Sequence, residues 1–247
     1  MKVIYILWLR QIKRFFRSKA RIIGSVGQPL LFLLALGFGM GPIFEKAGEG
    51  NYISFLSPGI IGMTILFSSI FNGVDVIWDR QFGFLKETLV APVSRFKIIL
   101  GRTLGGATTS FLQGLIVLAI TIPIGFSPNW SMLPIAVVFM FLIALFFTAL
   151  GTSIGSSLKD MQAFQLIMNF LVMPIFFLSG ALFPVEDLSK IMKYFVSANP
   201  LAYGIDGLRG SLIGVFHFGI GVDFLVLSVL TIIGLIISSY IFSKIEA

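Results

Sequence analysis

Long stretches without a charged residue constrain this chain more than any other feature of its sequence. Four such stretches exceed 20 residues, a fifth covers 224–243, and the longest, 103–158, is divided by the turn Ser127-Pro128-Asn129. About 20 helical residues cross the ~30 Å apolar core of a bilayer. The sequence therefore predicts an all-α integral membrane protein with six transmembrane helices, at about 22–43, 55–77, 98–126, 132–157, 162–183 and 221–243.

Composition supports the same class. Hydrophobic residues make up 57% of the chain and charged residues 12%, which leaves too little polar surface to cover a soluble domain. Within lipid the backbone polar groups must find partners inside their own helices, because no water is present to bind them. We expect one transmembrane domain over residues 1–247.

The placement of Lys and Arg predicts the orientation of the chain. If successive loops alternate sides, fourteen of the 18 basic residues fall on the side that carries both termini. Both termini are therefore expected in the cytoplasm, in a multi-pass protein of the cell membrane. The net charge of +7 is then a signal of topology and of contact with membrane lipid, and not of nucleic-acid binding.

Cysteine and histidine are too scarce for several kinds of chemistry. The chain has no Cys and a single His, His217, which excludes disulfides, thiolate catalysis and a metal cluster built on these residues. No metal site is predicted.

Residues 1–21 have the pattern of an amphipathic helix. At 100° per residue the apolar side chains gather on one side and the basic ones opposite, as expected for a helix in the headgroup plane. Two interpretations remain: a basic topology signal that happens to be helical, or a lever on the cytoplasmic surface that contacts a partner. The apolar side holds Ile4, Tyr5, Trp8, Leu9, Ile12, Phe15 and Phe16, and the basic side Arg10, Lys13, Arg14, Arg17 and Arg21.

A dense group of charges lies at 79–102. Phe82, Leu85 and Leu89 recur at helical spacing, and Pro92 ends the pattern because the residue before a proline leaves the helical region. The predicted helix, 79–92, is too short to be stable alone in water. It either caps a cytoplasmic loop or docks against a soluble protein.

The segment 184–216 is predicted to form two short helices on the outer side, separated at Asn199-Pro200. Asp206 and Arg209 are three residues apart and can pair on one face. The segment is either a turn whose Arg209 reaches the outer headgroups or a re-entrant structure that closes the outer side.

Ionisable residues are scarce within the spans, where a charge costs about 2.5 to 3.5 kcal/mol. Asp75 comes nearest, and its position beside Asp79 predicts an interfacial location. The uncharged polar residues either line a substrate path or form hydrogen bonds between helices. They are Ser68, Ser69, Asn72, Gln165, Asn169 and Ser179.

Two pairs of glycines predict close helix packing. Gly101 and Gly105, and Gly151 and Gly155, each have the spacing that lets two helix backbones approach.

Two blocks of sequence resemble the ABC-2 type transporter permease family. The first is LKETLVAPVSR at 85–95, followed by Gly101-Arg102. The second is FFLSGALFP at 176–184, followed by NPLAY at 199–203 and DGLR at 206–209. Both occur in the family's order, so the resemblance covers essentially the whole chain. Lys86 departs from the apolar residue that many relatives carry, which affects local docking contacts.

The resemblance implies a permease subunit that pairs with a second copy or a paralogue and with two cytoplasmic ATPase subunits. It would export a hydrophobic or amphipathic substrate, such as a drug or lipid-linked molecule. The residues expected to couple it to the ATPase are Arg80, Phe82, Leu85, Glu87, Leu89, Pro92 and Arg95. The expected outer gate consists of Phe183, Pro184, Asn199, Pro200 and Arg209.

The chain carries no nucleotide-binding motif of its own. No G-x-x-x-x-G-K-[ST] and no Gly-Lys pair occur. We therefore expect no catalytic activity and no bound cofactor in this chain, with ATP and Mg used by the partner. The alternative is a secondary transporter or channel driven by an ion gradient. A membrane enzyme is disfavoured by the lack of Cys, of a His cluster and of paired intramembrane carboxylates.

Overall fold

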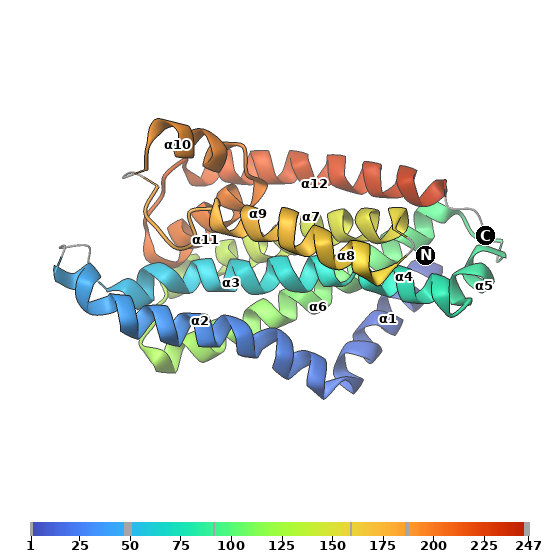
Figure 1. Cartoon of the computed structure of the whole chain (residues 1–247), viewed down its shortest axis with the longest axis horizontal. Helices are drawn as coiled ribbons and strands as arrows, with labels where there is room; N and C mark the ends of the chain where they lie inside the picture. The colour runs from blue at the N-terminus through green and yellow to red at the C-terminus, as the bar shows by residue number, and fades with distance from the viewer. Residues whose placement is uncertain (1, 47–50, 91, 159, 186–187, 245–247) are drawn as a thin grey trace.

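The computed structural model describes residues 2–46, 51–90, 92–158, 160–185 and 188–244, and this part of the chain contains helices and no strands. The first residues of α1 (Lys2–Arg17) and the last of α12 (Ile220–Ser243) lie at the end of the bundle that carries α5 (Phe84–Val90). α10 (Lys190–Ser197) and α11 (Pro200–Ile213) lie at the opposite end (Figure 1). These ends are called the α5 end and the α11 end.

Five helical segments are long and apolar enough to cross a membrane, which confirms the all-helical membrane fold. They are Ile22–Phe44 within α2 (Lys19–Lys46), Tyr52–Gln81 formed by α3 (Tyr52–Phe71) and α4 (Val74–Gln81), Arg95–Ile124 or α6, Trp130–Ser157 containing α7 (Leu133–Ser157), and Ile220–Ser243 or α12.

The sixth expected span, 162–183, is shorter in the structure. α8 (Met161–Ile167), a π-helical segment (Met168–Val172) and α9 (Met173–Phe177) follow one another, and the helix ends before Leu178. Fewer than 18 residues at 1.5 Å each reach about 25 Å, short of the ~30 Å core. The count of six spans remains a prediction.

α3 forms the centre of the bundle and packs against α2, α6, α7 and α11. It ends where Gly73 lies against the glycine pair of α7. A Cβ atom on Gly73 would stand 2.0 Å from the carbonyl oxygen of Gly151, and one on Gly155 would stand 2.1 Å from that of Gly73. The predicted glycine spacing thus places two backbones in contact where α3 gives way to α4.

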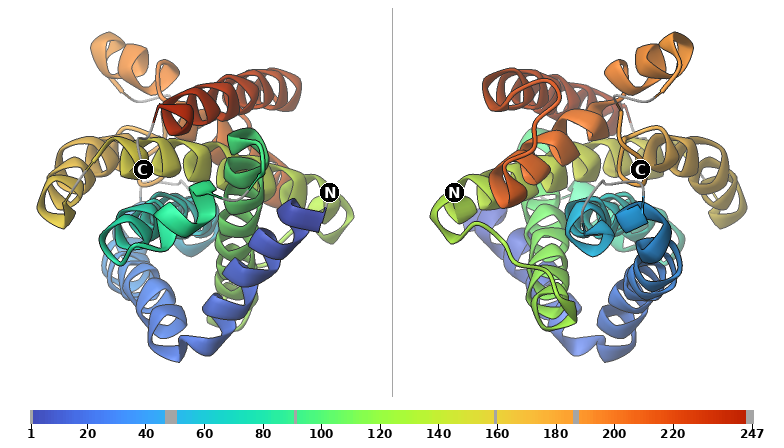
Figure 2. Two further views of the ribbon diagram at one scale, coloured as in Figure 1. Left: turned by 90° about the vertical axis from the view of Figure 1, so that its right-hand side faces the viewer. Right: turned by 90° about the vertical axis from the view of Figure 1, so that its left-hand side faces the viewer.

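α1 packs along α6 and is separated from α2 by Ser18 (Figure 2). A Cβ atom on Gly105 would lie 2.7 Å from the Cβ of Gln11, so the pair Gly101 and Gly105 on α6 packs closely against α1. Trp8 Nε1–H donates a hydrogen bond of 3.0 Å to Thr108 Oγ1. Leu7, Gln11 and Phe15 are the buried face of α1. That face differs from the apolar side expected from the sequence, since Gln11 lies within it and Tyr5 and Phe16 are exposed.

Candidate functional site

The helix expected at 79–92 is divided in the structure. α4 ends at Gln81, Gly83 adopts a φ of 79°, and α5 contains only seven residues. Glycine accepts this left-handed backbone without a steric penalty. Arg80 therefore belongs to α4, Phe82 to the turn, and Pro92 to the segment after α5.

The predicted apolar stripe is also divided. Leu85 is buried in a cluster with Leu7 of α1, Val76 of α4 and Phe242 of α12. Phe82 is 82% exposed and Val90 81% exposed. Glu87 is exposed between them, and the side chain of Leu89 lies outside the described residues. The exposed residues Phe82, Glu87 and Val90 are called the α5 tip.

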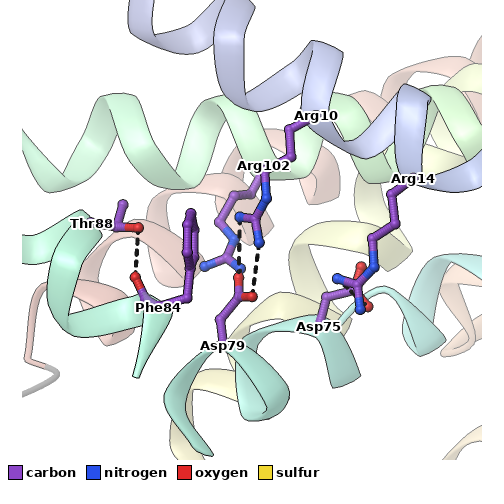
Figure 3. A network of polar contacts seen from close by, with 7 residues as sticks. All are labelled: Arg10, Arg14, Asp75, Asp79, Phe84, Thr88 and Arg102. Atoms are coloured by element: carbon purple, nitrogen blue, oxygen red, sulfur yellow. Dashed lines mark hydrogen bonds and ion pairs between the residues drawn. The ribbon is translucent and has the colours of Figure 1, made fainter. Parts of the chain in front are cut away.

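Buried ion pairs join α4 to α1 and α6 immediately behind the α5 tip (Figure 3). Asp79 accepts hydrogen bonds from Arg10, at 3.0 Å to Oδ1, and from Arg102. Asp75 pairs with Arg14 at 3.2 Å. Both carboxylates and Arg102 are less than 7% exposed. Three helices are thus joined by two buried carboxylates and buried Arg102, while Arg10 and Arg14 of α1 stay about one-third exposed.

Arg10 also connects this network to α5. Its guanidinium lies 3.8 Å from the centre of the Phe84 ring, a cation–π contact that is stronger when desolvated. Burial lowers the pKa of Arg10 from its ordinary value, and the charge of Asp75 acts in the opposite direction. Phe84 begins α5, so α1 touches the helix directly.

Two of the predicted coupling arginines bind the ends of other helices. Arg80 donates to the carbonyl oxygens of Ser156 and Leu158, both at 2.7 Å, at the C-terminus of α7. Arg95 donates to the carbonyl of Ser243 at the C-terminus of α12. A cation there satisfies carbonyls that have no partner within the helix and matches the helix dipole.

The partners Arg10, Arg14 and Arg102 were not among the predicted coupling residues. Their signal was present in the sequence, because Asp75 and Asp79 have the i, i+4 spacing that Arg10 and Arg14 also have. Two acids on one helix face can match two arginines on another. The sequence alone did not show which helices are neighbours.

At the α11 end, Asn199 organises the backbone around it. Its amide donates to the carbonyl oxygens of Ile175, at 2.6 Å, and Leu178, at 2.9 Å. Its Oδ1 accepts from the N–H of Leu201, at 3.0 Å, which caps α11, while Pro200 occupies the first turn. Asn199 is 7% exposed.

Arg209 is buried beneath the same segment. It donates a hydrogen bond of 2.9 Å to the carbonyl oxygen of Gly180 and lies 4.0 Å from the centre of the Phe55 ring. At 5% exposure it does not extend outward from the bundle. Phe183 is 48% exposed on the loop that Asn199 and Arg209 support, and Pro184 follows it.

Asp206 and Arg209 were expected to pair with each other, but each binds backbone groups. Asp206 accepts hydrogen bonds from the N–H groups of His217, at 2.8 Å, and Phe218, at 2.7 Å. It therefore fixes the turn from α11 into α12. The expected pairing relied on spacing alone, and the buried backbone groups nearby supply the partners instead.

Asp223 is a buried acid that the sequence reasoning missed. It is 0% exposed in the first turn of α12, and neither carboxylate oxygen has an N–H or O–H donor among the described residues. The carboxyl group of Asp206 lies nearby.

Three of the six polar residues considered for a substrate path form hydrogen bonds to another helix: Ser68, Ser69 and Asn72. Asn72 donates to the carbonyl of Gly106, at 3.1 Å, and to Ser110 Oγ, at 3.0 Å. Ser68 bonds Ser110 at 2.9 Å, Ser69 donates to the Ala144 carbonyl at 3.4 Å, and Ser179 bonds the Phe176 carbonyl at 2.6 Å. Gln165 and Asn169 are exposed along α8 and the π-helical segment, so they do not face the interior of this bundle.

One cavity of about 610 Å³ lies where α1 meets α2, beside α3, α4 and α6. Ser68 and Gln113 line its inner side, and Arg14 and Asp75 line it near the α5 end.

A helical bundle of this kind, with membrane-spanning segments and a short charged helix at one end, is typical of a transport component. The ABC-2 type transporter family model matches residues 2–213. The chain belongs to this family, as its two sequence blocks indicated.

Named relatives agree with this assignment. The chain is 30% identical over 210 residues to transport permease ycf38 of Cyanophora paradoxa, covering 80% of this chain and 71% of the relative. It is 32% identical to ycf38 of Pyropia yezoensis, covering 81% and 70%. It is 26% identical to nodulation protein J of Rhizobium leguminosarum bv. trifolii, covering 85% and 78%. The chain is thus a membrane transport permease, a component that is not itself catalytic.

Proposed function

We propose that this chain is the permease subunit of an ATP-driven exporter in the cell membrane, with the α5 end in the cytoplasm. Two ABC ATPase subunits would bind at that end, supplying ATP and Mg, and a second copy or paralogue of this permease would complete the pathway. The substrate would be hydrophobic or amphipathic, such as a drug or lipid-linked molecule. Family membership and the placement of basic residues support this orientation.

The single observation that carries the proposal is the α5 tip. Phe82, in the turn before α5, and Val90, the last residue of α5, are more than 80% exposed outside the spans. Large apolar side chains that face water favour a protein partner, and Glu87 between them adds a charged contact. An ATPase surface of complementary shape would cover them.

The contacts behind the α5 tip suit it to transmit movement. Leu85 packs against α1, α4 and α12, and Arg10 joins Phe84 to the ion pairs of α4 and α6. Arg80 and Arg95 attach α4 and α6 to the ends of α7 and α12. Displacement of α5 by a closing ATPase would therefore move several helices together.

The α11 end would act as the outer gate. Asn199 and Arg209 hold the loop that carries Phe183 from inside, so a shift of α11 would move this loop. Gln165 on α8 and Asn169 and Phe170 on the π-helical segment are exposed and would face the second permease. The pathway would run between the two subunits.

The test compares two charge reversals in chains purified from their native membrane. Glu87→Lys should reduce co-purified ATP hydrolysis about tenfold, because it places the wrong charge within the docking surface. Lys190→Glu is the matched control, since Lys190 is exposed on α10 at the opposite end. Equal ATP hydrolysis with both variants would contradict the proposal. Arg95 is less suitable for reversal because it also holds α12.

Transport driven by an ion gradient is the second candidate, and the buried carboxyl pair Asp206–Asp223 is the observation in its favour. A buried ionisable residue within a membrane-spanning helix is a feature of proton-coupled carriers, and Asp223 is 0% exposed in α12. Transport that persists when ATP is depleted but an ion gradient is held would favour this candidate. Loss of transport under that condition is the result expected for the exporter.

A further inference from the structure

The cavity beside the α1–α2 junction combines an apolar wall with a few polar groups. Its volume of about 610 Å³ lies within the ~300–1,000 Å³ range of ligand sites, which are mostly apolar with a few placed polar groups. Met63, Phe67 and Val74 supply apolar surface, and the cavity is contained within a single subunit. None of its lining residues is among Gln165, Asn169 and Phe170, the exposed residues assigned above to the second permease.

The cavity opens toward the outside of the bundle. Met63, Val74 and Gln113, on its inner wall, are each at most 5% exposed. On its rim Phe71 is 42% exposed and Trp78 39% exposed. Because these rim residues belong to a membrane-spanning segment, a lipid-like molecule would reach the cavity from the bilayer.

Gln113 points to a ligand that can form a hydrogen bond. It is 1% exposed and lines the cavity, and its Oε1 has no hydrogen-bond partner among the described residues. A buried polar group left without a partner costs about 1–3 kcal/mol. A hydroxyl or amide group on a ligand would remove this cost.

Charge favours an anionic headgroup at the other end of the cavity. Arg14 lines it there, and Arg10, Lys13 and Arg17 line an adjoining hollow along α1 that shares Arg14 and Ser18 with it. Asp75, the acid that lines the cavity, is paired with Arg14. The surroundings of this end are therefore predominantly positive.

The two polar regions lie at different depths. Ser68 of α3 and Ser110 of α6 are at the same depth, because they share a hydrogen bond. Asp75 is seven residues beyond Ser68 toward the α5 end, about 10 Å, and Gln113 is three residues beyond Ser110 toward the α11 end, about 5 Å. Gln113 and Asp75 are therefore about 15 Å apart along the bundle. We propose that this cavity binds an anionic amphiphile from the leaflet at the α5 end, with a hydroxyl or amide group about 15 Å along its chain. That the amphiphile is the exported substrate rests on the proposed function, whereas its binding to the cavity does not.

Trp78 on the rim provides a direct measurement. A Trp8→Phe/Trp130→Phe variant leaves Trp78 as the single tryptophan, and a dibrominated long-chain fatty acid quenches tryptophan fluorescence at short range. Quenching of Trp78 should saturate and should be reversed by a hydroxylated fatty acid at about fivefold lower concentration than by its unhydroxylated form. A long-chain alkylammonium and inorganic phosphate should compete weakly.

Two glycines of α2 supply a matched pair of variants. A Cβ added to Gly24 or Gly27 would meet no atom within 4 Å, and only Gly24 lines the cavity. In the Trp78 background Gly24→Leu should abolish saturable quenching and Gly27→Leu should retain it. Gln113→Leu should retain fatty-acid binding and remove the fivefold advantage of the hydroxylated form.

Linear quenching that is the same for Gly24→Leu and Gly27→Leu would overturn the proposal, because it would report only partition into the detergent micelle. Equal competition by the alkylammonium would overturn the anionic assignment. Fatty-acid binding is measured without an ATPase. A result that contradicts the cavity proposal can therefore be told apart from one that contradicts the proposed export function, which is tested by ATPase co-purification.

Discussion

The two ends of the bundle are held by different kinds of contact. At the α5 end, Asp75 and Asp79 bind arginines on other helices, so charge joins side chain to side chain. At the α11 end, Asn199, Asp206 and Arg209 bind backbone N–H and carbonyl groups. At the α5 end the side-chain pairs, together with Arg80 and Arg95 bound to the ends of α7 and α12, fix the relative positions of whole helices. At the α11 end the bonds to backbone groups fix the course of the segments on either side of α11.

This difference matches the proposed roles. Helices that must move together under an ATPase benefit from contacts between their side chains. A loop that opens and closes a path needs a defined local shape in each state. The comparison also predicts which substitutions can be compensated by a second one.

Asp79→Asn is expected to have the largest effect. It leaves Arg10 and the buried Arg102 without their countercharge, and an uncompensated buried charge costs about 3–5 kcal/mol. The free energy of unfolding, measured by denaturant titration in detergent, should fall by about that amount. Glu87→Gln, at an exposed position, is the control and should change stability by less than about 0.5 kcal/mol. Equal stability of the two variants would show that the network does not hold the α5 end.

Asn199→Ala is expected to have the next largest effect. It removes the donor to the carbonyls of Ile175 and Leu178 and the cap of α11, at a cost of about 2–3 kcal/mol. Hydrogen exchange should increase within 178–185 and around the start of α11, and remain unchanged in α5. The control is Ser197→Ala, because Ser197 forms an exposed bond within α10. Faster exchange at both ends would contradict a local role.

The sequence predicted the helices well and their contacts less well. Uncharged length located the spans because lipid admits few alternatives to a helix, and Pro92 and Asn199-Pro200 marked real breaks. The break at Gly83 was missed since glycine accepts many conformations. Arg209 was predicted to pair with Asp206, to reach the outer headgroups or to belong to the outer gate, and the spacing did not indicate its bonds to carbonyls 28 and 29 residues away in the chain. Such contacts depend on tertiary packing, which periodicity does not encode.

The charge swap Arg14→Asp/Asp75→Arg should have the smallest effect and tests the comparison most directly. Arg14 retains 35% side-chain exposure, so solvent weakens the pair, and we expect a coupling of about 1 kcal/mol. Each single substitution places like charges together and should lower the free energy of unfolding. The double variant should recover about 1 kcal/mol relative to the sum of the single effects, as measured by the same titration. If it recovers nothing, Arg14 and Asp75 act through position-specific contacts, as Asn199 does, and the α5 end is held no differently from the α11 end.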